Sequence, residues 1–293
     1  MQPRSTSRAC AFLVFSVLAI GPPAEAQTKP STTARPGAYL GELTWTEAEV
    51  RLKTSPLVIL PFGAGAKEHG PHLPMNADFK VLEYLCDRAV EAFPVVVAPP
   101  IQHGWFPAFR EFPGTEVSDP EVFQEYVAEV ARSLVRHGAK RVVILNTGVA
   151  AATGLPLSIV AREIRAAGTP ALVISWNQLG TPEYRALLEQ KIDSHGGESE
   201  TSINLYLQPH LVHLDRAVKD LHRGGPRPYA GYEPGGYSRN PADPDFSKTG
   251  ITGDPTKATA EKGKKLLELM TAELLKSLRG FSEAPLVKKA APG

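Results

Sequence analysis

The feature that most constrains the fold is the stretch of residues 58–78, where an apolar segment leads into a loop of glycines, prolines and polar side chains. The segment opens with the β-branched residues Val58 and Ile59, which favour a buried strand, and it breaks at the Pro-Phe-Gly of residues 61–63. A helical pattern follows over residues 79–93, with Asn76 or Asp78 as its expected cap. The stretch therefore predicts a strand, a long loop and a helix.

The loop in this stretch concentrates side chains that can bind a metal ion. Glu68, His69, His72 and Asp78 lie within eleven residues of one another. Two imidazoles and two carboxylates form a ligand set that suits zinc, manganese or iron. The alternative is a polar surface loop with solvated histidines. The glycines and prolines that would fix the loop in place favour the first interpretation.

Strands and helices alternate along the rest of the chain. Strands are expected at residues 95–98, 141–145 and 171–175. One helix is expected from a cap at Ser118 to a stop at Gly138, and another over residues 155–167. Alternation with short connections predicts an α/β fold of three layers, α/β/α, around a mostly parallel sheet. Ligands bind such sheets beyond the carboxyl ends of the strands, where the polar clusters of this chain fall.

A second polar cluster is the segment of residues 195–202, His-Gly-Gly-Glu-Ser-Glu-Thr-Ser. Its glycines would let the backbone approach a ligand closely, and a helix from about Glu198 would direct its first amides at that ligand. His195 could carry a proton, because an imidazole titrates near neutral pH. Glu200 could bind metal from the first helical turn. The alternative is an ordinary helix start, where acidic residues match the helix dipole.

Two further loops are expected at the same edge of the sheet. After the strand at 95–98, His103 could bring another imidazole to the site; the alternative is an ordinary loop histidine. After the strand at 141–145, residues 146–151 read Asn-Thr-Gly-Val-Ala-Ala. Gly148 and Ala150 have no side chain that can bind a metal.

These segments resemble the signatures of the creatininase (creatinine amidohydrolase) family. The first signature matches at residues 60–63 (Leu-Pro-Phe-Gly), at residues 69–74 (His-Gly-Pro-His-Leu-Pro) and at Asp78. The second matches at residues 195–202, and residues 41–45 and 253–263 resemble the opening and closing segments of the family. The resemblance covers about residues 41–278.

The chain departs from the family at two places that bear on chemistry. The family has a metal-binding glutamate two residues before the first histidine, where this chain has Lys67, and the loop here is one residue longer. Family members also carry a histidine, and some a glutamate, where this chain has Gly148 and Ala150. We therefore expect Glu68 to point into the site and Lys67 to point away from it.

The resemblance implies a metal-dependent hydrolase of the amidohydrolase type that acts on non-peptide C–N bonds. The implied substrate is a small-molecule amide, with cyclic amides included. The ligand set that it implies is Glu68, His69, Asp78 and Glu200, with His195 as the catalytic residue. Because ligands are missing, we expect one divalent metal ion or fewer per chain, with zinc, manganese or iron as candidates. The alternative is a non-catalytic small-molecule-binding protein with a degenerate metal site. The resemblance also implies a homo-oligomer.

The amino terminus has the features of a secretory signal peptide. Residues 1–26 combine a basic start, an apolar core at residues 9–20 and the small-x-small sequence Ala-Glu-Ala at residues 24–26. We expect cleavage after Ala26, a disordered leader over residues 27–37, one creatininase-like domain over residues 38–280, and a flexible tail over residues 281–293. The expected location is periplasmic or secreted.

The charge and cysteine content of the processed chain exclude some classes of partner. Removal of residues 1–26 leaves equal numbers of basic and acidic residues and no basic block, so neither nucleic acid nor a membrane is an expected partner. Cys86 is then the only cysteine, and it fits the apolar pattern of a helix. The segment of residues 224–256 is rich in glycine and proline and is expected to be a long irregular excursion.

Overall fold

The computed structural model describes residues 35–221, 237–243 and 245–286. Its central sheet has five strands, all parallel, in the order β1-β3-β2-β4-β5. The strands are β1 (Ala38–Tyr39), β2 (Leu57–Phe62), β3 (Val95–Val97), β4 (Val142–Asn146) and β5 (Ala171–Ser175). The predicted signal peptide, most of the leader and the end of the tail lie outside the described residues.

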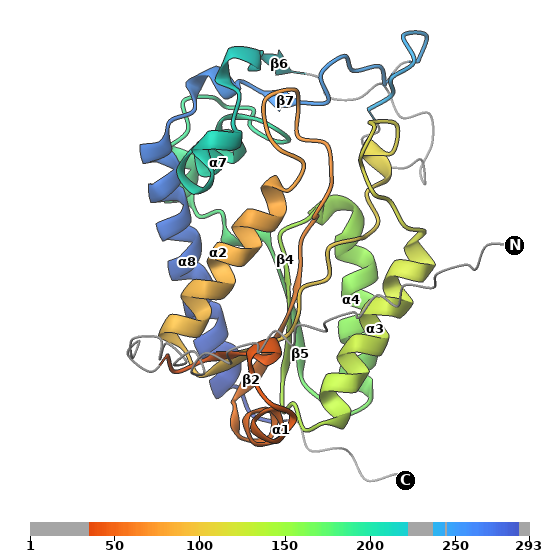
Figure 1. Ribbon diagram of the computed structural model, residues 1–293, viewed down its shortest axis with the longest axis vertical. Coiled ribbons are helices and arrows are strands. Elements are labelled where there is room, and N and C mark those ends of the chain that lie inside the picture. The colour runs from red at the N-terminus through yellow and green to blue at the C-terminus, as the bar shows by residue number, and fades with distance from the viewer. Residues whose placement is uncertain (1–34, 222–236, 244, 287–293) are drawn as a thin grey trace, which may run out of the picture. The chain divides into compact units, whose positions relative to one another are not determined.

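Helices cover both faces of the sheet (Figure 1). One face packs against α2 (Ala77–Ala92), α7 (Glu198–Leu207) and α8 (Ala260–Glu283), and the other against α3 (Pro120–Arg136) and α4 (Ala150–Ala166). Strand β2 serves both cores, because alternate side chains of a strand point to opposite faces. Val58, Leu60 and Phe62 join the core under α3 and α4, whereas Leu57 and Ile59 join the core under α2 and α8. The predicted three-layer α/β/α class with a mostly parallel sheet is confirmed.

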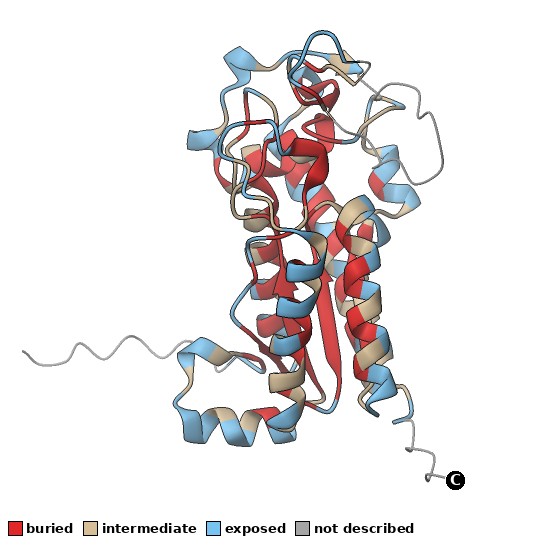
Figure 2. Ribbon diagram, turned by 90° about the vertical axis from the view of Figure 1, so that its right-hand side faces the viewer, coloured by how far each residue is buried: buried red, intermediate tan, exposed pale blue. Residues whose placement is uncertain are grey.

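Burial follows this layering. Buried residues run along the strands and the inner sides of the helices, and the outer sides of the helices are exposed (Figure 2). Cys86 is buried in the core beneath α2, and burial raises the pKa of its thiol. No helix in the described part of the chain has the length and apolar character needed to cross a membrane.

Some element boundaries differ from the prediction for identifiable reasons. Helix α3 takes Asp119 as its N-cap instead of Ser118, and Pro120 occupies the first helical position, which suits its fixed φ. Helix α4 begins at Ala150 instead of residue 155, because its first turns are alanine-rich and carry no apolar period. Strand β1 was not predicted; its two residues are too few to show a pattern. Helix α8 continues to Glu283, into the segment expected to be a tail.

Shorter elements complete the described chain. Helix α1 (Trp45–Thr54) starts with a capping box at Thr44. The remaining elements are η1 (Leu40–Glu42), η2 (Pro107–Phe109), α5 (Trp176–Leu179), α6 (Pro182–Ala186), η3 (Pro209–Leu211), η4 (Leu214–Arg216), β6 (Asp220–Leu221), β7 (Thr252–Gly253) and η5 (Pro255–Lys257). Nearly half of the predicted excursion at residues 224–256 lies outside the described residues.

The carboxyl ends of the inner strands form one level edge. Phe62 is the register partner of Asn146, and Asn146 is the register partner of Ser175, so β2, β4 and β5 end side by side. The loops that follow these strands therefore share one space, as expected for a parallel sheet.

Candidate active site

A cavity of about 400 Å³ opens at this edge of the sheet. Its lining comes from the β2–α2 loop, the start of α2, the turn after β4, helices α5 to α7 and the segment around Tyr237. Lys67, Asp78, His195 and Glu200 are the charged or titratable lining residues that the sequence analysis singled out. Elements distant in the sequence therefore bring both predicted polar clusters to one cavity.

The β2–α2 loop is fixed by hydrogen bonds from its own backbone. The Lys67 N–H donates to Met75 O at 3.0 Å, and the Lys67 carbonyl accepts from His69 Nδ1 at 2.8 Å. His69 is fully buried, and its Nε2 lies 2.9 Å from Asp78 Oδ1. At Gly70, φ is +80° and a Cβ atom would lie 2.4 Å from the Ile251 side chain, so only glycine fits this turn.

Lys67 points into the site, so the expectation that it points away is wrong. Its Nζ lies 3.0 Å from Asp78 Oδ2, and the two side chains are only 3% and 4% exposed. The same ammonium lies 4.9 Å from the centre of the Phe109 ring, within the range of a cation–π contact. Burial alone would raise the pKa of Asp78, but the nearby charges and hydrogen bonds of Lys67 and His69 hold it well below its usual range.

Glu68 and His195 form a second buried pair. Glu68 Oε2 lies 2.8 Å from His195 Nε2, and Glu68 Oε1 accepts a hydrogen bond from the Gly70 N–H. Burial alone would raise the pKa of the Glu68 carboxyl, but the charge and hydrogen bond of His195, the Gly70 bond and the charge of His69 together lower it. The His195 ring also packs against the Phe109 ring, with the ring centres 4.1 Å apart and the ring planes tilted by 34°. His195 is therefore held in one orientation at the cavity wall.

Glu200 lies on the other side of His195, in the first turn of α7. Its Oε2 is 3.9 Å from His195 Nδ1 and accepts the Gly196 N–H at 2.8 Å. Gly196 has a φ of +60°, and a Cβ atom there would lie 2.5 Å from the Ile251 side chain. The His-Gly-Gly sequence thus makes a turn in which the backbone helps to place the Glu200 carboxylate.

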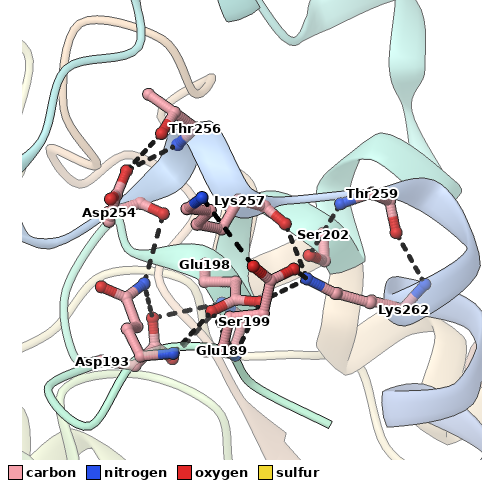
Figure 3. Close-up of polar contacts among 11 residues, drawn as sticks. Glu189, Asp193, Glu198, Ser199, Ser202, Asp254, Thr256, Lys257, Thr259 and Lys262 are labelled. Atoms are coloured by element: carbon pink, nitrogen blue, oxygen red, sulfur yellow. Dashed lines mark hydrogen bonds and ion pairs between the residues drawn. The ribbon is translucent and has the colours of Figure 1, made fainter.

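A separate polar network holds the His195 loop to its surroundings (Figure 3). The fully buried Glu198 carboxylate accepts hydrogen bonds from the N–H groups of Glu189 and Gln190 and lies 2.6 Å from Lys262 Nζ on α8. Asp193 accepts from the Ser199 N–H at 3.3 Å. Burial raises the pKa of Asp193 to about 6, partly offset by its bonds to Ser199. The loop of residues 189–198 is therefore closed at its base by Glu198.

The turn after β4 contains no charged residue. Asn146 is fully buried and donates to the hydroxyls of Thr153 and Ser175 at 3.0 and 3.2 Å. A Cβ atom at Gly148 would lie 3.0 Å from Phe62 Cε1, and Phe106 follows at 3.4 Å. Aromatic rings thus fill the space beside Gly148 that a longer side chain would need.

Two histidines of the sequence analysis take no part in the cavity wall. His103, a candidate replacement ligand, has a side chain that is 71% exposed and pairs with Glu116 at 2.6 Å, so of the two alternatives the structure favours the loop histidine. His72 is fully buried, and its Nε2 lies 2.8 Å from Thr201 Oγ1. Burial is the main reason that the pKa of His72 falls to about 4.

The structure brings all five predicted site residues to one region, although their roles stay predictions. His69, His195 and Glu200 present ligand atoms that all lie within 4.8 Å of one another. Glu68 acts on His195, and Asp78 lies between His69 and Lys67. Phe109, at the end of the short helix η2, and Tyr237, in the glycine-rich excursion, were not predicted from the sequence. No periodic pattern marks either of them.

The donor set fits one metal ion better than two. His69 donates through Nδ1 to a backbone carbonyl and so presents Nε2, the arrangement typical of metal-binding histidines. A second ion beside Asp78 Oδ2 would meet the Lys67 ammonium. Repulsion between a divalent ion and a unit charge about 4 Å apart is on the order of 8 kcal/mol at an effective dielectric near 20. Gly148 and Ala150 offer no ligand that would offset this repulsion.

The fold and the cavity define a three-layer α/β/α protein with a polar site at the carboxyl edge of a parallel sheet. The family model for creatininase, described as creatinine amidohydrolase, matches residues 41–278, so this chain belongs to the creatininase family. It is 32% identical over 264 residues to creatinine amidohydrolase of Pseudomonas putida, covering 82% of this chain and 96% of that protein. It is 30% identical to the mycofactocin precursor peptide peptidase of Mycolicibacterium smegmatis, covering 73% of this chain and 81% of that protein.

Solved creatininases share the fold. A mutant complexed with creatine superimposes with a TM-score of 0.70 at 31% identity, covering 83% of this chain and 98% of that chain. A manganese form has a TM-score of 0.70 at 30% identity, covering 85% of this chain and 100% of that chain. A zinc form of a mutant also has a TM-score of 0.70 at 30% identity, covering 84% and 98%. Family members are thus hydrolases that have been solved with zinc or manganese.

Proposed function

We propose that this protein is a hydrolase of the amidohydrolase type that acts on a C–N bond of a small amide inside the cavity. The observation that carries the proposal is the buried Glu68–His195 pair, which places an oriented imidazole at the wall of a 400 Å³ cavity. Relatives named for creatinine and for a precursor peptide set the range of substrates to be tried. The cavity volume suits a small molecule or the end of a peptide.

In this proposal His195 moves the proton and Glu68 positions it. Glu68 accepts the Nε2 proton, which leaves Nδ1 facing Glu200 and the cavity. A buried carboxylate behind an imidazole fixes the ring and stabilises the charge it gains when it takes up a proton. The Lys67 ammonium lies at the same wall and presents positive charge to an oxygen of the substrate.

One divalent metal ion, zinc, manganese or iron, would be held by His69 and Glu200, with Asp78 beside His69. When bound, the ion would polarise the carbonyl group of the substrate and lower the pKa of a bound water. The family match supports a metal requirement, and the loss of ligands at Gly148 and Ala150 supports one ion or fewer.

Hydrolysis and metal content of the same purified protein test the proposal. Creatinine, other small amides and short peptides would be supplied with zinc, manganese or iron, and bound metal would be counted by elemental analysis. His195→Gln should abolish hydrolysis and leave bound metal unchanged, and His210→Gln, at an exposed histidine, should alter neither. Loss of metal in His195→Gln would make His195 a ligand instead of the proton carrier.

The alternative function is a non-catalytic small-molecule-binding protein. The bare turn at Gly148 and Ala150 and the Lys67 ammonium are the observations that favour it. Tight binding of a small amide without turnover, in protein with or without bound metal, would establish this alternative and overturn the hydrolase.

The proposal includes export. The basic start, apolar core and Ala-Glu-Ala sequence of residues 1–26 support cleavage after Ala26 and a periplasmic or secreted location. Sequencing the amino terminus of the protein from its native cell should give Gln27. Met1 on protein from the cytoplasm would overturn this part.

A further inference from the structure

Both the backbone and the side chain of Lys67 are held in place at the site, where the side chain pairs with Asp78. Both backbone groups of Lys67 are bonded, the N–H to Met75 O and the carbonyl to His69 Nδ1, so the loop fixes where the side chain starts. The ammonium then lies between Asp78 Oδ2 and the face of Phe109. With only 3% of the side chain exposed, this charge is not a solvated surface charge that could move aside.

The two oxygens of Asp78 face different partners. Oδ1 lies 2.9 Å from His69 Nε2, and Oδ2 lies 3.0 Å from Lys67 Nζ. A metal ion bound to Oδ2 would need the position that the ammonium holds. The neighbouring turn adds no metal ligand, because Gly148 and Ala150, which line the cavity there, have no side chain that can bind a metal.

We infer that the Lys67 ammonium is a permanent, covalently attached substitute for a second metal ion, so that this centre takes one cation from the chain and at most one from solution. The inference rests on the proposed single-ion site and deepens it. Lys67 places a positive charge 3.0 Å from Asp78 Oδ2 at the wall of the cavity. The charge of the ammonium is present whether or not metal is available, whereas the charge of a second bound ion would depend on the supply of metal.

The direct test is Lys67→Glu, which exchanges the ammonium for a carboxylate beside Asp78. Equilibrium dialysis against zinc or manganese, followed by elemental analysis, counts ions per chain in the wild type and the variant. We expect one ion or fewer in the wild type and one more in Lys67→Glu. Lys264→Glu makes the same charge change at an exposed site of α8 and should match the wild type.

Two outcomes would overturn the inference. One is a wild type that binds two ions. The other is a folded Lys67→Glu that binds no more than the wild type. The inference and the proposed function can fail separately. If the wild type binds no metal but Lys67→Glu binds one ion, the inference holds and the proposed single-ion site does not.

A second variant keeps the test decisive if Lys67→Glu does not fold. Lys67→Met leaves the Asp78 carboxylate without its ammonium, so a divalent ion should recover part of the melting temperature that the substitution costs. We expect zinc or manganese to raise the melting temperature of Lys67→Met by more than that of the wild type. Equal shifts in the two proteins would overturn the inference.

Discussion

Two lysine–carboxylate pairs of this molecule each contain a buried carboxylate, and they differ in what surrounds that carboxylate. In the pair between α7 and α8, Glu198 is fully buried and accepts two backbone N–H groups as well as Lys262. In the pair at the end of β2, Asp78 meets Lys67 and His69, and both members of the pair line the cavity. The first pair has all its partners within the protein, whereas the second borders space that a ligand can enter.

The difference teaches that a buried charge does not by itself mark a functional site. Glu198 belongs to the same His-Gly-Gly-Glu-Ser-Glu segment as Glu200, only two residues away. Yet Glu198 closes the base of the loop (Figure 3). Glu200 instead lines the cavity. Helical geometry separates the two carboxylates, because residues two apart on a helix do not share a face. The predictions below test this division between scaffold and site.

The largest expected effect is on the scaffold pair. Glu198→Ala leaves two backbone N–H groups without their acceptor and removes one of the partners of Lys262, which keeps Glu189 and the Lys257 carbonyl, so we expect the free energy of unfolding to fall by about 3–5 kcal/mol. Urea unfolding followed by circular dichroism measures it. The control Glu261→Ala removes a fully exposed carboxylate from the same helix as Lys262 and should leave stability nearly unchanged. Equal losses in the two variants would contradict a structural role for Glu198.

The second effect is on the cavity pair and depends on pH. Lys67→Met should lower the free energy of unfolding by about 3 kcal/mol at pH 7, because Asp78 then keeps only His69 as a partner. Lys67 lowers the pKa of Asp78 in the folded protein, so the Lys67–Asp78 pair stabilises the fold above the ordinary aspartate pKa of 3.8. This stabilisation is lost as the pH falls below that value. The deficit should therefore shrink as the pH falls below about 4.

Urea unfolding at neutral pH and below pH 4 measures this pH dependence. The matched control is Lys80→Met, which breaks a half-exposed pair with Glu83 on α2 and should cost less than about 1 kcal/mol at either pH. A deficit in Lys67→Met that is the same at both pH values would mean that lost packing, and not the charge of Asp78, is responsible.

The third effect concerns function. Glu68→Gln weakens the acceptor behind His195, and loss of such a positioning partner typically lowers activity about 10–100-fold. The rate of hydrolysis of a small amide and the metal content of the same protein measure it. The rate should fall and the metal content should stay the same, because Glu68 acts through His195. Glu116→Gln breaks the exposed pair with His103 and is the matched control, for which no change is expected. Unchanged activity in Glu68→Gln would remove Glu68 from the site.

Much of the fold could be predicted from the sequence because it depends on local patterns. The strands β2, β4 and β5 are mostly apolar runs, and α2 and α3 carry a helical period. Strand β1 could not be predicted, because pairing with β3 and not its two-residue sequence makes it a strand.

The candidate site could be predicted only as a set of residues. The spacing of His69, Asp78, His195 and Glu200 identified groups that do meet at one edge of the sheet. The direction of Lys67 could not be predicted, because it depends on the Asp78 carboxylate and Phe109, which the chain brings together only in three dimensions. The family pattern, with a metal-binding glutamate near this position, predicts the opposite direction, whereas the Lys67 ammonium itself lies beside Asp78.

The smallest effect concerns His72, which joins the cavity loop to α7 through Thr201. Burial lowers the pKa of His72 to about 4, whereas an unfolded histidine titrates near 6.5. The unfolded state therefore binds a proton first as the pH falls, and stability is lost between pH 6.5 and 4. Replacement by Gln removes this titration, so the drop in unfolding free energy between pH 7 and pH 5.5 should shrink by about 1 kcal/mol. His137→Gln, at an exposed histidine, should keep the wild-type drop. If both variants lose stability with pH as the wild type does, His72 is not the group that titrates, and the coupling between the cavity loop and α7 does not depend on its neutral form.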